Sequence, residues 1–282
     1  MSTASIAQTN ESVFLKWKIR QQETLTYKTV MQEIDTANFK EVSLNLGGLA
    51  KLFEDTTSAH KNAVKRLFSE VNKSLEKNDL ITDLSINAKG NIDVTMTLRK
   101  KDIDSSKRDT TSRKDAELEG FMRALSTNVM LRGAITTSGQ IESFYVKNDQ
   151  KNLIAMLFEL PNKEVKIGDK WSITANLISM DQNFKCDSSY KKNIVTLIDL
   201  KKSGSDQIAI IKYDVVEFVV GDFINPMVKK NVKTTMKITY NGVSEFSITE
   251  GRWSKYEGIM SITSSGVMTS NSTKKVTLIK VD

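Results

Sequence analysis

The chain has 282 residues, with 41 basic and 34 acidic side chains that give a formal net charge of +7. This length suits one large domain or two small ones, and 39% hydrophobic with 27% charged residues indicates a globular rather than a disordered protein. The single cysteine excludes an internal disulfide, and one histidine beside it argues against a zinc site of Cys and His ligands.

The first residues, MSTASIAQTNES, lack the charged and apolar regions of an intact signal peptide. We expect residues 1–12 to be a flexible tether and residues 13–282 to form a single domain. No window approaches the roughly 20 apolar residues that cross a bilayer. Two settings stay open: a cytoplasmic protein that starts here, or a mature secreted chain behind an added start methionine.

Period-two alternation of apolar residues predicts strands through the first half of the chain. Residues 13–19 place Val13, Leu15, Trp17 and Ile19 on one face, and residues 25–34 continue the pattern. Further strands are expected at residues 80–87, 92–99, 129–136 and 140–146. Gly90 and Gly139 lie in the turns between them, where a positive φ is needed.

The second half of the chain is predicted to be almost entirely strand. The expected ranges are 170–178, 192–200, 207–220, 232–240, 243–249, 252–263 and 267–281. Asn241-Gly242 is the strongest hairpin signal, because a type I′ turn needs positive φ at both central positions. Long strands with short turns predict a large, curved, mostly antiparallel sheet, open or half closed into a barrel.

Three segments change to helical periodicity. Residues 58–77, 116–128 and 149–160 each carry one apolar stripe, and the last ends at Pro161. A helix with one apolar stripe must pack on an apolar surface, and the sheet offers the largest. The expected fold class is therefore α+β, with about three helices on one face of the sheet. The polar stretch at 100–114 is the candidate boundary between two parts of this domain.

Few residues suggest catalysis. His60 starts a predicted helix, and Cys186 lies between Lys185 and Asp187 without a nearby histidine. The basic stretch at 99–114 contains aspartates and no aromatic residue, so it predicts a solvated loop rather than a nucleic-acid surface. Acidic pairs are plentiful, but nothing selects one for hydrolysis. We expect no catalytic residue, metal or cofactor.

The apolar composition is more suggestive. The chain has 11 methionines, a residue type that fills irregular spaces and adapts to varied ligands. Helices packed on a curved sheet could enclose an apolar pocket, although an ordinary packed core is the favoured interpretation of the same residues. The candidate ligand-lining residues are Phe68, Phe121, Met122, Leu125, Met156 and Trp171.

One phrase carries a resemblance. Leu160, Pro161, Val165, Gly168 and Trp171 follow the spacing L-P-x-x-x-V-x-x-G-x-x-W. This phrase resembles one that recurs in uncharacterised secreted or lipoprotein-type bacterial domains. The resemblance implies a cell-envelope setting, periplasmic or surface-exposed, and brings no known activity. The predicted architecture is also similar in outline to periplasmic lipid-carrier folds.

These observations together lead to three hypotheses. The first is a non-enzymatic binding or scaffolding protein of the cell envelope, holding an apolar or amphipathic molecule between helices and sheet. The second is a structural or protein-interaction domain, which binds another envelope protein through an exposed strand edge. The third and least favoured is a carboxylate-based hydrolase. We expect no nucleic-acid partner, and a membrane tether only through a removed N-terminal segment.

Overall fold

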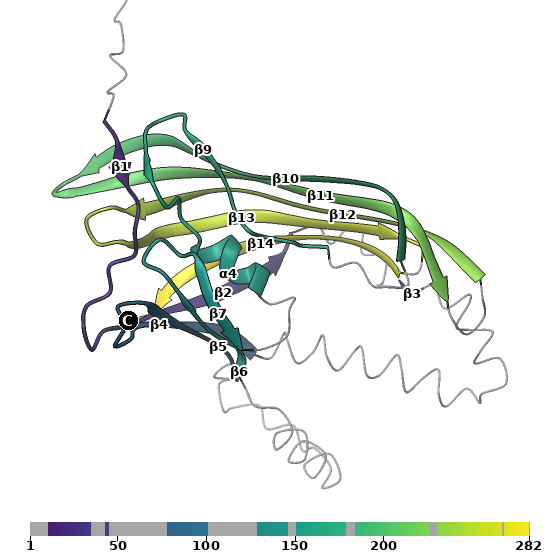
Figure 1. Cartoon of the computed structure of the whole chain (residues 1–282), viewed down its shortest axis with the longest axis horizontal. Coiled ribbons are helices and arrows are strands. Elements are labelled where there is room, and N and C mark those ends of the chain that lie inside the picture. The colour runs from purple at the N-terminus through teal and green to yellow at the C-terminus, as the bar shows by residue number, and fades with distance from the viewer. Residues whose placement is uncertain are drawn as a thin grey trace, which may run out of the picture.

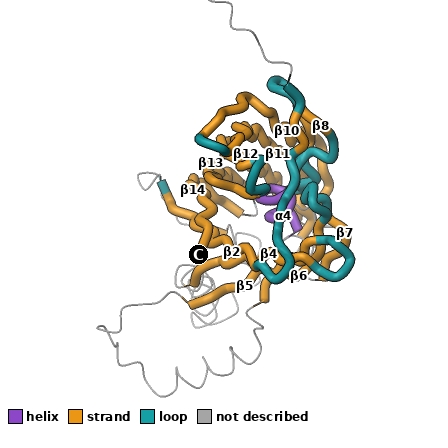
Figure 2. The backbone as a smooth tube through the Cα atoms, turned by 90° about the vertical axis from the view of Figure 1, so that its left-hand side faces the viewer, coloured by secondary structure: helices purple, strands orange, loops and turns teal. Residues whose placement is uncertain are grey.

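The structure is a computed structural model, and it describes residues 11–34, 43–44, 78–100, 129–145, 151–178, 184–225, 230–266 and 268–281. Over these residues the protein is nearly all β: strands make up 71% and a helix 4%. Long strands curve past the helix, which lies on the inner side of the bend (Figure 1). In the view turned by 90°, the strands wrap around the helix (Figure 2).

Eleven strands form one antiparallel sheet in the order β7-β6-β5-β4-β2-β14-β13-β12-β11-β10-β9. Their bounds are β2 Thr24–Glu33, β4 Asn78–Ile86, β5 Ile92–Lys100, β6 Val129–Ile135, β7 Ile141–Tyr145, β9 Lys170–Ser172, β10 Phe184–Ser203, β11 Asp206–Asn225, β12 Lys230–Ser247, β13 Arg252–Ser265 and β14 Met268–Val281. A short strand, β3 (Ser43–Leu44), also pairs with β14, and β1 (Val13–Phe14) pairs with β8 (Glu164–Val165) in a separate sheet.

The expected α+β class with about three helices is wrong for the part of the chain that the structure describes. That part contains one helix, α4 (Lys151–Phe158), within the expected range 149–160. The expected helices at 58–77 and 116–128, and the boundary stretch beyond Lys100, lie outside the described residues. The fold is β-dominated because the C-terminal strands pair along most of their length. Among the described residues, large aromatic side chains and the single helix α4 together fill the inner face at this end of the sheet.

The hairpin predicted at Asn241-Gly242 is also wrong. Strand β12 runs straight through both residues, and Gly242 pairs with Tyr213 on one side and Gly258 on the other. A Cβ at Gly242 would lie 2.6 Å from the Glu257 carbonyl oxygen. Close backbone approach, rather than a reversal of the chain, therefore explains this glycine.

The N-terminal segment crosses one end of the curved sheet. The predicted alternation is confirmed, since Val13, Leu15, Trp17 and Ile19 are all buried, although only Val13 and Phe14 form a strand. The Trp17 amide donates to the Thr137 carbonyl (2.7 Å), and the Lys18 amide donates to the Gly251 carbonyl (3.0 Å). This segment thus joins the turn after β6 to the turn before β13.

Aromatic side chains dominate the core between the sheet and the helix. They contact one another mostly edge to face, a favourable geometry for aromatic rings, and the centroids of contacting rings lie between 5.1 and 6.3 Å apart. The cluster consists of Trp17, Tyr27, Phe158, Tyr213, Tyr240, Phe246, Trp253 and Tyr256. It fixes α4 at one end of the concave face.

Candidate functional site

Side chains from β13 and from the N-terminal segment donate hydrogen bonds to the carbonyl groups of the last turn of α4. Tyr256 Oη donates to the Met156 carbonyl (2.8 Å), Trp253 Nε1 donates to the Leu157 carbonyl (2.8 Å), and Trp17 Nε1 donates to the Phe158 carbonyl (2.9 Å). The last carbonyls of a helix have no partner within the helix, so these three donors satisfy groups that would otherwise be buried without hydrogen bonds. The helix end is therefore fixed in position.

The chain leaving α4 is pinned against the turn between β6 and β7. The Leu160 amide donates to the Ser138 carbonyl (2.8 Å). Gly139 has φ +75°, and a Cβ there would lie 1.9 Å from the Phe158 carbonyl oxygen. Only glycine allows both the backbone conformation and the close approach. This contact brings residues 159–163 alongside β9.

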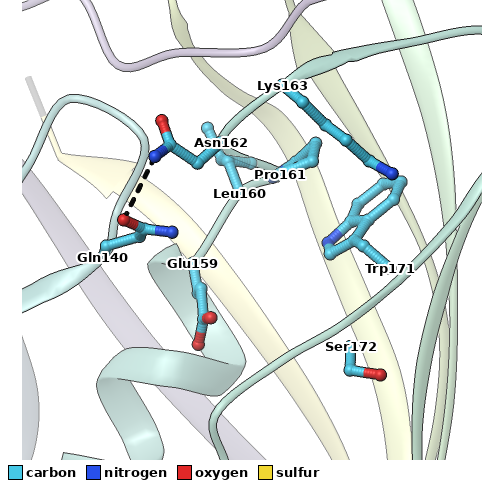
Figure 3. Close-up of a pocket in the computed structure, with 8 residues that line it drawn as sticks. All are labelled: Gln140, Glu159, Leu160, Pro161, Asn162, Lys163, Trp171 and Ser172. Carbon is cyan, nitrogen blue, oxygen red and sulfur yellow. Dashed lines mark hydrogen bonds between the residues drawn. The ribbon is translucent and has the colours of Figure 1, made fainter.

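A small pocket forms at this junction (Figure 3). Its volume is about 190 Å³. The lining residues come from the turn after β6, the chain that leaves α4, and β9: Gln140, Glu159, Leu160, Pro161, Asn162, Lys163, Trp171 and Ser172. The pocket thus lies beside the phrase that carries the resemblance.

Glu159 is the acidic residue of this pocket. Its side chain is buried, and it accepts hydrogen bonds from the Thr174 amide (2.7 Å) and the Thr174 hydroxyl (3.0 Å). Burial raises the pKa of the Glu159 carboxyl, and the two hydrogen bonds from Thr174 partly oppose that rise. The lining includes no second carboxylate, so this pocket does not supply the acid pair that glycoside hydrolysis requires.

Trp171 forms the opposite wall. Its Nε1 is inaccessible to solvent and has no hydrogen-bond acceptor among the described residues. The Lys163 side chain extends toward the Trp171 indole (Figure 3). Pockets that enclose drug-sized molecules usually measure about 300–1,000 Å³, so this pocket is too small to enclose a long apolar chain.

Residues 173–178 continue β9 and lie between β10 and α4, where side chains satisfy their backbone groups. Asn193 on β10 donates to the Ala175 carbonyl (2.6 Å), and Glu159 accepts from the Thr174 amide on the other side. Asn152, in the first turn of α4, donates to the Asn176 carbonyl and accepts from the Asn176 amide (2.8 Å). This edge is therefore protected against pairing with another strand.

The concave face continues beyond α4 along the long strands (Figure 1). Apolar side chains lie opposite one another there, as the pairs Val219↔Met236 and Ile238↔Ile262 show. Val219 and Ile238 are buried, yet neither belongs to the core cluster around the helix. The part of the face that these four residues define is called the outer concave face below.

One carboxylate lies within this apolar surface. Glu217 is 5% exposed, and its direct neighbours across the sheet are Lys191 and Ile238. Glu217 Oε2 accepts a hydrogen bond from the Ile178 amide (3.0 Å). Glu217 Oε1 is 3.5 Å from Lys191 Nζ and accepts no hydrogen bond from the described residues. Glu217 therefore marks the border between the aromatic core and the outer concave face.

The six candidate ligand-lining residues named from the sequence do not come together at one site among the described residues. Met156 is buried in α4 as part of the core, and Trp171 is half-buried in the small pocket. Phe68, Phe121, Met122 and Leu125 lie outside the described residues.

The sequence analysis missed Glu159 and Glu217. Each is a single carboxylate within an apolar run, LIAMLFELP for Glu159 and VVEFVV for Glu217. A half-exposed strand would show polar residues at every second position. A single acidic residue in an otherwise apolar run therefore indicates a carboxylate that is buried with its neighbours.

The fold and the polar groups define a β protein whose curved antiparallel sheet holds a short helix. A scan of protein-family models finds no family that matches the chain, and comparisons with curated proteins and with solved structures find no significant match. Among the described residues, none of the helical structure is long and apolar enough to cross a membrane.

Proposed function

We propose that this protein is a non-enzymatic binding module that holds an apolar or amphipathic small molecule against the outer concave face. The observation that carries the proposal is the continuation of apolar pairs beyond the aromatic core, as in Val219↔Met236 and Ile238↔Ile262. Met236 and Ile262 of these pairs are only partly buried, and burial of their exposed apolar surface would favour binding of an apolar molecule.

Two further features support binding over catalysis. The small pocket contains a single carboxylate, Glu159, and both of its oxygens accept hydrogen bonds from Thr174. Met236 on the outer concave face is flexible and polarizable, which suits adaptable apolar contacts. A cell-envelope location is part of the proposal and rests on the resemblance at Leu160–Trp171.

The test is a fluorescence titration of delipidated protein with the neutral apolar dye phenylnaphthylamine. Saturable binding at one dye per chain, reversed by a long-chain alcohol, is the expected result. Binding that never saturates, or none at all, would remove the proposal.

A matched pair of variants localises the site. Val219 lies on the concave side and Val220 on the convex side of the same strand, since Glu217 and Val219 share the face of the buried Val215. Val219→Thr places a hydroxyl in the apolar surface and should weaken binding about fivefold, because burying an unpaired hydroxyl costs about 1–3 kcal/mol. Val220→Thr should leave the affinity unchanged. Equal effects of the two substitutions would place the dye elsewhere.

A second candidate function is supported by the other sheet edge. In the described part of the chain, β7 pairs with β6 alone, and Tyr145 on β7 is 81% exposed. The backbone of the opposite edge is bonded by Asn152 and Glu159, whereas the one side-chain bond to β7 in that part, from Asn91, reaches the Glu142 side chain and leaves the β7 backbone uncovered. An extended segment of another envelope protein could add a strand here. Ser143→Pro would remove a backbone donor from this edge and should abolish capture of a partner from an envelope extract, while dye binding persists.

A further inference from the structure

We infer that the molecule bound on the outer concave face is an amphipath whose polar end donates hydrogen bonds, a primary amine or a hydroxyl rather than a carboxylate, and that Glu217 binds this end. The inference rests on the proposed function and specifies its ligand class. Its basis is a buried carboxylate oxygen that accepts no hydrogen bond and lies beside the apolar residues Val219 and Ile238.

The surroundings of Glu217 are apolar on three sides. Val215 and Val219 flank it along β11, and Ile238 lies directly across on β12. All three side chains are buried. A carboxylate in such surroundings is strongly destabilised unless donors and a positive charge compensate for its lost hydration.

The described residues provide only part of that compensation. Glu217 Oε2 accepts a hydrogen bond from the Ile178 amide, whereas Oε1 accepts no hydrogen bond and has only its ion pair with Lys191. Lys191 Nζ is 3.5 Å from Oε1 and instead donates to Asn176 Oδ1. Because Lys191 is 45% exposed at its side chain, its ammonium group can move into solvent when another donor approaches Oε1.

Glu217 Oε1 favours a ligand with a hydrogen-bond donor at its polar end. An ionised carboxylate only accepts hydrogen bonds, and charge-assisted bonds to an ammonium are the strongest available. A neutral hydroxyl also donates, with less electrostatic gain. A ligand carboxylate would bring a second negative group against Glu217 in a poorly hydrated place. The apolar chain of the ligand would then extend along Met236 and Ile262, whose side chains are only partly buried.

The experiment compares three twelve-carbon probes that differ only at the polar end: dodecylamine, dodecanol and dodecanoate. Each displaces phenylnaphthylamine below its aggregation concentration. We expect the amine to bind about tenfold more tightly than dodecanoate, since hydrogen bonds to charged groups contribute about 1.5–3 kcal/mol, and the alcohol to lie between them.

The variant Glu217→Gln keeps an acceptor for the Ile178 amide and removes the charge. It should abolish the preference for the amine, whereas Glu245→Gln, on the convex side of β12, should keep it. Lys191→Met removes the competing ammonium and should strengthen amine binding. If circular dichroism shows that Glu217→Gln does not fold, the affinity of Lys191→Met for dodecylamine tests the inference instead.

The outcomes separate the two proposals. Equal binding of all three probes, unchanged by both substitutions, would overturn the role of Glu217 while leaving an apolar binding module intact. Tighter binding of dodecanoate than of dodecylamine would also overturn it. Failure of the dye and of every probe to bind would overturn the proposed function itself.

Discussion

The indole N–H of Trp253 donates a hydrogen bond to the main-chain carbonyl of Leu157, across 2.8 Å. A side chain at the start of β13 thereby holds the last turn of the helix that lies against it. Trp17 and Tyr256 make equivalent bonds to the neighbouring carbonyls. The helix position therefore depends on three aromatic donors from distant parts of the chain.

Trp253→Phe should lower the free energy of unfolding by about 2 kcal/mol or more, because it leaves the Leu157 carbonyl buried without a partner. Trp171→Phe should cost much less, since Trp171 Nε1 has no acceptor among the described residues. Urea denaturation measures both. To separate loss of volume from loss of the bond, benzothienylalanine, in which sulfur replaces the N–H, can be placed at each position. Equal costs at the two positions would contradict a specific role for the Trp253 bond.

Gly139→Ala should be far more destabilising than Gly90→Ala. Both glycines have positive φ, +75° and +82°, so alanine is strained at either position by about 1–2 kcal/mol. At Gly139 the added Cβ also meets the Phe158 carbonyl oxygen, whereas at Gly90 it enters open space. We expect an additional loss of about 2 kcal/mol at Gly139, from displacement of the helix end. Similar melting temperatures for the two variants would show that the helix end adapts freely.

The stability contribution of Glu159 should depend on pH. Burial raises its folded-state pKa above the ordinary value of 4.5, so between these two values the folded protein binds more protons than the unfolded chain. Stability from this residue is then fully present below pH 4.5 and is lost as the pH rises through the raised pKa. The difference in unfolding free energy between wild type and Glu159→Gln should therefore decrease with rising pH.

Urea denaturation at intervals from about pH 4 to about pH 7 measures this difference. A wild-type advantage over Glu159→Gln that increases with pH would show that the Thr174 hydrogen bonds outweigh burial.

Gly258→Ala should be destabilising because of Tyr240. A Cβ at Gly258 would lie 2.5 Å from the Tyr240 ring. In a Tyr240→Leu background the same substitution should cost about 1 kcal/mol less, since direct neighbours show coupling energies of about 0.5–3 kcal/mol. A double-mutant cycle by thermal or urea denaturation gives this coupling. Additive costs would mean that the backbone, rather than the ring, limits the site.

Local pattern predicted much of the sheet. Alternation identified the buried residues Leu15 and Trp17, and glycine placement identified the turns at Gly90 and Gly139. Local pattern failed at Asn241-Gly242, because a turn signal and a glycine required by packing look the same in sequence. The space beside Gly242 is set by Tyr240 and Glu257, and only the paired strands bring these groups together.

The predicted number of helices was too high for the described residues for a related reason. An apolar stripe shows that a segment needs a partner surface, but it does not show how much of the sheet that segment covers. The candidate site was likewise only partly predictable. Trp171 was named for its place in a phrase, while Glu159 and Glu217 gain their properties from burial by distant strands. Neither burial nor pairing is visible in a single sequence.

The pairing of β2 with β14 has a consequence for how the protein is made. Tyr27 on β2 lies beside Lys280 on β14 in this pairing, so β2 can pair on this side only after β14 has been synthesised. During synthesis the ribosome releases β2 long before β14 exists, so this side of β2 stays unpaired until β14 has emerged. Folding should be slow, because the sheet depends on pairing between segments that are far apart in the chain. Nascent chains cut before β14 should expose two open strand edges and be prime targets for chaperones.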